Sequence, residues 1–217
     1  MRNKRRFRKS KFLATIENHI NQNIKEYAIS TLVFILGVII GVMILNSSNE
    51  ESKKNISGYI NEFVNTIKNR EYEVDTNKLL MKSITSNLKV ALIIWISGST
   101  LIGIPLVYGS LGYKGMCIGY SISAIIAALD KSKGITVALS SMLLQNIIAI
   151  PCILALAVSS VKMHKVIMKE HNKNDLKFEI YRHTIFSLIM AAGLVISSFI
   201  EIFLSTNLTS NIIINLI

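Results

Sequence analysis

The sequence predicts an all-α membrane protein, a polytopic helix bundle of about five transmembrane helices with amphipathic helices at the interfaces. Three observations predict this fold class. The 217-residue chain is 51% hydrophobic with a mean hydropathy of +0.46. Its apolar residues gather in long runs without charge, and its charged residues lie between these runs. Such segregation is typical of helices solvated by lipid, because a charged side chain is costly within the hydrocarbon.

Residues 1–27 are expected to form a basic arm and an interfacial helix. Seven Lys/Arg fall within the first 11 residues. Apolar residues then recur at spacings of three and four, namely Leu13, Ile16, Ile20, Ile24 and Tyr27. This pattern predicts an amphipathic helix that lies on the membrane surface and contacts membrane lipids. The transmembrane domain is expected to occupy residues 28–217.

The first membrane span is predicted at residues 28–45, which contain no ionisable group. As a helix this run would be roughly 27 Å long, close to the hydrocarbon thickness of a bilayer. Every face is apolar apart from Ser30 and Thr31, which is unlike a soluble helix. The run is long for a signal peptide and no Ala-X-Ala pattern follows it, so we expect an uncleaved anchor.

Four more runs without Asp, Glu, Lys or Arg follow, at residues 90–108, 115–129, 135–161 and 183–199. The simplest count is therefore five spans. The 15-residue third run is short, and we expect it to extend back through Gly112, with Lys114 reaching the interface. Pro105 in span two and Pro151 in span four are expected to kink their helices, because proline removes a helical hydrogen bond.

Small residues at spacings of four predict close helix packing. They are Gly37 and Gly41 in span one, and Gly115, Gly119 and Ser123 in span three. Helices in lipid associate where small side chains let their backbones approach. The spacing leaves open whether these faces pack within one subunit or form a homodimer.

Charge predicts the orientation. With the N-terminus in the cytoplasm, the inner side carries 15 Lys/Arg, including Lys114 and those of the basic loop 162–182, against nine outside. The positive-inside rule then places the excursion 46–87 and the C-terminus outside the cell. The net charge of +11 does not indicate nucleic acid, because no helix-turn-helix, zinc ligand set or aromatic-interleaved basic strand accompanies it.

The excursion 46–87 contains one amphipathic helix, which places Ile60, Phe63 and Ile67 on one apolar face. One such helix is too small to fold alone, so this face needs a cover. Lipid, the chain's own spans and a partner protein are the alternatives, and we expect a partner. Asp75 is expected to cap the helix that follows.

No residue pattern indicates catalysis. The four histidines show no metal-ligand spacing, and no nucleophile elbow or phosphate-binding loop is present. We therefore expect no catalytic, cofactor-binding or metal-binding residues, and not an enzyme. Glu201 is the exception to weigh, since an acid inside a span could relay protons, but its position near the end of span five favours interfacial solvation.

Three segments carry a family resemblance. They are Asn18–Asn23 leading into FILGVIIGVMILNS, GIPLVYGSLGYKGMCIGYSISAIIAAL from Gly103, and LLQNIIAIPCILALA from Leu143. In order and spacing they resemble the stage II sporulation protein M family of endospore-forming bacteria, over nearly the whole chain.

The resemblance implies a five-span protein of the bacterial cell membrane, located in a sporangium at the septal or engulfing membrane. It implies a non-catalytic scaffold that anchors and localises two cell-wall hydrolases, sporulation proteins D and P, for septal peptidoglycan thinning and engulfment. The alternative is a permease-like transporter subunit coupled to a cytoplasmic partner. Few intramembrane charges favour the scaffold, whereas the two helix-breaking prolines keep transport open.

Overall fold

The computed structural model describes residues 20–69, 75–100, 102–129, 131–169 and 173–216, and these form helices without any strand. In chain order they are α2 (Ile24–Asn46), α3 (Glu50–Lys68), α4 (Thr76–Gly98), α5 (Gly103–Ala128), α6 (Lys131–Lys169), α7 (Lys173–Ile200), the π-helical turn η1 (Glu201–Ser205) and α8 (Thr206–Leu216). The predicted all-α class is confirmed. Of the interfacial helix predicted within residues 1–27, the part up to residue 19 lies outside the described residues, whereas Ile24 and Tyr27 belong to α2 and thus to the first span.

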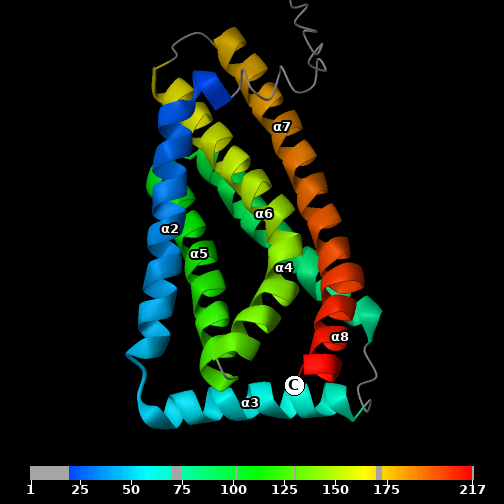
Figure 1. Cartoon of the computed structure of the whole chain (residues 1–217). Helices are drawn as coiled ribbons and strands as arrows, with labels where there is room; N and C mark the ends of the chain where they lie inside the picture. Colours follow the sequence, from blue (N-terminus) through cyan, green and yellow to red (C-terminus); the bar gives the residue numbers. More distant parts are fainter. Residues whose placement is uncertain (1–19, 70–74, 101, 130, 170–172, 217) are drawn as a thin grey trace, which may run out of the picture.

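Five helical segments within the described ranges are long and apolar enough to cross a membrane: α2, α4, α5, α6 and the continuous run Leu176–Asn215. The expected count of five is confirmed. Figure 1 shows α3 lying across one end of the bundle, crosswise to α2. We call this the α3 end. The opposite end, where α6 stops and α7 starts, is called the basic end because Lys162, Lys165, Lys169, Lys177 and Arg182 lie there.

The expected second span, 90–108, is in fact two helices. α4 ends at Gly98, and α5 begins at Gly103 after a turn. Thr100 N donates to Ser97 O at 3.1 Å, and the Thr100 carbonyl lies 2.8 Å from His164 Nδ1, which ties the turn to α6. The third span is therefore 26 residues long and not short, so it reaches across the hydrocarbon by length.

The two prolines occupy different positions. Pro105 does not kink span two, as expected from the sequence, but lies in the first turn of α5. There the N–H groups have no intrahelical acceptor, so proline costs the helix no hydrogen bond. Pro151 lies inside α6, which is helical throughout and visibly bent (Figure 1).

The small-residue faces of α2 and α5 face each other within one chain. A Cβ added at Gly119 would lie 2.1 Å from Val38 O, and one added at Gly41 would lie 2.1 Å from Met116 O. Added Cβ atoms at Gly37 and Gly115 would likewise come within 2.4 Å of a backbone oxygen of the facing helix. Ser123, one turn further along α5, is half-buried. These glycine faces are thus covered by the facing helix of the same chain.

The main core surrounds α6, which contacts α2, α4, α5 and α7. Its fully buried side chains include Ile94, Val107, Leu111, Leu156 and Leu194. The outward surfaces remain apolar, as a lipid environment requires. On α2 alone, Leu32, Ile35, Leu36, Ile39, Ile40 and Met43 are exposed.

Candidate functional site

At the α3 end the amphipathic helix α3 packs its apolar face against the ends of the membrane helices. The Asn49 side chain accepts a hydrogen bond from Ser52 N at 3.1 Å and so caps the start of α3. Val64 and Ile67 are 4% and 6% exposed. They pack in a small cluster with the buried residues Leu129, Val137 and Ile213, which follow α5 or belong to α6 and α8.

This packing corrects the expected partner-binding face. Ile67 is covered by the chain's own helices, and Ile60 is half-buried against the same cluster. Of the three expected residues, only Phe63 is exposed, at 44%. Tyr59, one turn earlier, is 74% exposed. We call Tyr59 and Phe63 the outer aromatic pair.

A polar network crosses the bundle interior behind α3. Lys114 Nζ donates to Asn87 Oδ1 at 3.1 Å, and Asn87 Nδ2 donates to Ser198 Oγ at 2.9 Å. Asn87 is 4% exposed and Ser198 is fully buried. The network therefore joins α5, α4 and α7 by hydrogen bonds between side chains that lie far apart in sequence.

A second set of hydrogen bonds, around Glu201, joins α4 to α6, and we group it with this network. Ser83 Oγ donates to the Glu201 carboxylate. The Gln145 amide faces acceptors with its oxygen, so we assign the opposite orientation, in which its nitrogen donates to Glu201 Oε1 at 3.0 Å and Oε2 at 2.9 Å. Ser197 Oγ also donates to the Gln145 carbonyl at 3.0 Å, beside the bend in α6. Glu201 begins the π-helical turn η1, and such turns frequently accompany functional sites.

The structure corrects the expected positions of both charged residues. Lys114 was expected to reach the interface on the basic side, but it lies midway along α5 and bonds inside the bundle. Glu201 was expected to be solvated at the interface, but its oxygens are engaged by Ser83 and Gln145. Lys114 and Glu201 are thus both hydrogen-bonded within the bundle, which lowers the cost of burying them.

Sequence reasoning missed Ser83, Asn87 and Ser198. The available signal was spacing: Ser83 and Asn87 are four residues apart on α4, and Ser198 and Glu201 are three apart where α7 continues into η1, so each pair shares a helix face. Two such polar faces in apolar helices indicate that the helices face each other.

A pocket of about 410 Å³ lies between this network and α3. Its lining includes Glu201, Gln145, Tyr120 and Ser121 together with Ile60 of α3. These polar groups make the pocket suitable for water or a small polar solute.

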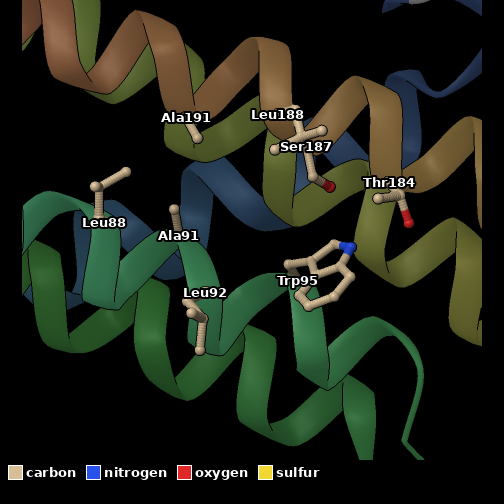
Figure 2. A pocket seen from close by; sticks show the side chains of 8 residues that line it. All are labelled: Leu88, Ala91, Leu92, Trp95, Thr184, Ser187, Leu188 and Ala191. Atoms are coloured by element: carbon tan, nitrogen blue, oxygen red, sulfur yellow. The ribbon is translucent and has the colours of Figure 1, made fainter.

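A second feature is an apolar groove between α4 and α7, of about 320 Å³ (Figure 2). Small residues, Ala91 on α4 and Ser187 and Ala191 on α7, lie between larger ones such as Trp95 and Leu188. The Ser187 hydroxyl is occupied, since it donates to the His183 carbonyl at 2.8 Å. The groove therefore offers an apolar surface to lipid or to another membrane helix.

No group of three or more His, Cys, Asp or Glu residues in the described ranges could hold a metal ion. His164 contacts the Thr100 carbonyl, and His183 Nδ1 lies 2.8 Å from Ser159 Oγ. Cys117 and Cys152 are free thiols. In the part of the chain described, the candidate site consists of the outer aromatic pair, the pocket beneath α3 and the polar network.

The family model described as Stage II sporulation protein M matches residues 30–206. Neither a curated protein nor a solved structure matches the chain. The matched residues run from α2 to the first residue of α8, and they include α3, the glycine contact and the polar network.

Proposed function

Because the chain belongs to the stage II sporulation protein M family and is a multi-pass membrane protein related to sporulation, we propose that it is a non-catalytic scaffold. In this role it anchors and localises cell-wall hydrolases for septal peptidoglycan thinning and engulfment. The partners proposed are sporulation proteins D and P, and glycan cleavage belongs to them.

The observation that carries this proposal is the way α3 is held. Its inner face is buried on the ends of the membrane helices, so its outer face has a fixed position. That outer face presents Tyr59 and Phe63, and exposed aromatic side chains on a rigid surface are frequent anchors of protein interfaces. The α3 end is thus a shaped surface and not a loose loop.

The proposal requires that α3 lie outside the cytoplasm, where peptidoglycan is found. The basic end supports this orientation, since Lys162, Lys165, Lys169, Lys177 and Arg182 lie opposite α3 and cytoplasmic segments are rich in Lys and Arg. In a sporulating cell the proposed location is the septal or engulfing membrane.

The test is Phe63→Glu, compared with Asn61→Glu on the same helix. Both positions are exposed and both changes add one negative charge. We expect Phe63→Glu to accumulate normally in the membrane but to recover less of the two hydrolases on purification, because a carboxylate would enter an apolar pocket of the partner. Asn61→Glu should recover them as the wild type does.

Two results would contradict this proposal. Full hydrolase recovery with Phe63→Glu would show that the outer aromatic pair does not bind them. Equal losses with Phe63→Glu and Asn61→Glu would indicate a general charge effect on α3 and not a docking contact.

A second candidate function is a permease-like transporter subunit. The observation that favours it is the pocket beneath α3, where Glu201 lies within the span and the buried network holds Lys114. Charged residues inside membrane helices often line the path of a solute or proton. The segment 162–182 would then serve a cytoplasmic partner.

Glu201→Gln separates the two functions. It removes the charge but keeps hydrogen-bonding groups of similar size for Ser83 and Gln145. Under the scaffold proposal, hydrolase recovery and engulfment should both persist. Loss of engulfment with normal protein level and normal hydrolase recovery would favour the transporter.

A further inference from the structure

A pocket of about 200 Å³ lies at the basic end, between α6, α7 and the segment that leads into α2. In Figure 1 that segment, in the darkest blue, lies beside the ends of α6 and α7. The residues that line it include Gln22, Ser159, Lys162, Glu179, Arg182 and Phe186. This pocket takes no part in the proposed docking of hydrolases.

One cation of the pocket, Lys162, has no ion-pair partner among the described residues and can bind an anionic ligand. The other, Arg182, is paired, since its Nη2 lies 2.6 Å from Glu179 Oε2. A guanidinium has five N–H donors, so Arg182 can bind Glu179 and still donate to another acceptor. Ser159 Oγ, which contacts His183 Nδ1 at 2.8 Å, adds a hydroxyl to the same pocket.

The pocket lies at the depth where hydrocarbon meets water. Lys162 is the first charged residue after the run 135–161, and Arg182 is the last before the run 183–199. Long runs of this kind mark the hydrocarbon layer, so their charged ends lie among the lipid headgroups. Phe186, one turn deeper along α7 than Arg182, gives the pocket an apolar wall on the side of the hydrocarbon.

We propose that this pocket binds the headgroup phosphate of an anionic phospholipid. Lys162 and Arg182 donate to the phosphate oxygens, Ser159 and Gln22 supply further polar contacts, and Phe186 packs against the glycerol and the first acyl carbons. Basic pockets between membrane helices at a headgroup layer are suited to such lipids. A free phosphate would use the cations but not the apolar wall.

The surrounding charges select an anionic lipid over a zwitterionic one. Among the described residues at this end, Glu179 is paired with Arg182 and Glu26 Oε1 is paired with Lys165 Nζ at 2.7 Å, so these two acids are neutralised. Lys162 therefore leaves the pocket with net positive charge. A headgroup that carries its own ammonium would bring a second cation to this positive region.

The experiment measures lipid binding to the purified full chain in detergent by native mass spectrometry. Phosphatidylglycerol and phosphatidylcholine are titrated separately, with inorganic phosphate as a competitor. We expect tighter binding of phosphatidylglycerol, little competition by phosphate, and roughly fivefold weaker phosphatidylglycerol binding to Lys162→Gln, as loss of one cation near a headgroup implies. Lys177→Gln, an exposed lysine at the same end that does not line the pocket, should bind like the wild type.

Three results would overturn the inference. Equal binding by Lys162→Gln and the wild type removes the pocket from lipid binding, and equal weakening by Lys177→Gln reduces the effect to general surface charge. Complete displacement of the lipid by inorganic phosphate assigns the pocket to a free anion.

A fold control keeps the test decisive. Lys162→Arg should restore phosphatidylglycerol binding, because it keeps the positive charge and the donors. Phe186→Ala should weaken lipid binding while leaving phosphate binding unchanged. If Lys162→Gln lowers the melting temperature, Lys162→Arg still shows whether any cation at this position suffices for binding, and weak phosphatidylglycerol binding by Lys162→Arg counts against the inference.

Discussion

Single atoms set how closely α2 and α5 approach. At Gly119 the hydrogen in place of a side chain leaves room for Val38 O, whereas Gly109 on the same helix has no heavy atom within 4 Å of an added Cβ. The two glycines therefore serve as a matched pair. One of them is required by the contact, and the other faces open space.

We predict that Gly119→Ala lowers thermal stability and that Gly109→Ala does not. The added methyl at position 119 must push Val38 away, at a cost of about 1 to 3 kcal/mol because backbone cannot yield as a flexible side chain does. Melting of both variants in the same detergent measures the difference. Equal melting temperatures would show that the α2–α5 contact relaxes freely.

The buried network gives a second residue-scale prediction. Asn87→Leu removes the acceptor of Lys114 Nζ and the donor to Ser198 Oγ. Lys114 then loses its hydrogen bond to Asn87 inside the bundle. We expect a loss of roughly 1 to 3 kcal/mol, as for other buried polar groups left unsatisfied. Asn77→Leu, at an exposed position of the same helix, is the control. Calorimetry that finds the two variants equally stable would contradict a structural role for the network.

At the scale of elements, α3 has a buried face that packs on the bundle and an exposed face that carries Phe63. Ile67→Glu would bury a carboxylate against Leu129 and Ile213, which is costly for an unpaired charge. We predict that it releases α3 and makes residues 50–68 more sensitive to protease, while Phe63→Glu leaves them protected. Limited proteolysis of both variants in membranes tests this, and protection of the Ile67→Glu variant would count against the buried face.

The sequence predicted those features of the helices that depend only on residues close together in the chain. Span one, the apolar face of α3 and the Asp75 cap, whose side chain accepts from Lys78 N at 3.0 Å, all belong to this kind. The sequence did not predict the break between α4 and α5, because the turn between them contains no charged residue. The uncharged run 90–108 was therefore interpreted as one span. The usable signal was Pro105, which is favourable in the first turn of a helix and unfavourable in its interior.

At the scale of the whole molecule, the arrangement of the helices decides which residues meet. Lys114 and Asn87 are 27 residues apart, and Ser83 and Glu201 are 118 apart. No local pattern pairs residues at such separations, so the network and the pocket beneath α3 followed only from the fold. The hydropathy pattern does not show which partner a charged residue meets in the fold. It therefore predicted that Lys114 lies at the interface, although Lys114 bonds to Asn87 inside the bundle.

The proposed orientation is a prediction about the whole molecule. In a background without Cys117 and Cys152, Ser52→Cys on α3 should react with an impermeant maleimide added to cells whose wall does not block the reagent. Lys177→Cys at the basic end should react only after the membrane is permeabilised. The reverse labelling pattern would invert the orientation and remove the proposed access of α3 to wall hydrolases.

The seating of α3 also has a mechanical consequence. Val64 and Ile67 pack among Leu129, Val137 and Ile213. A lateral force on α3 is therefore opposed by contact with the ends of several membrane helices. Under the scaffold proposal, an enzyme attached to α3 and moving along the wall would drag the entire bundle through the bilayer. Traction would then pass from wall to membrane through the short stretch of α3 that contains these two side chains.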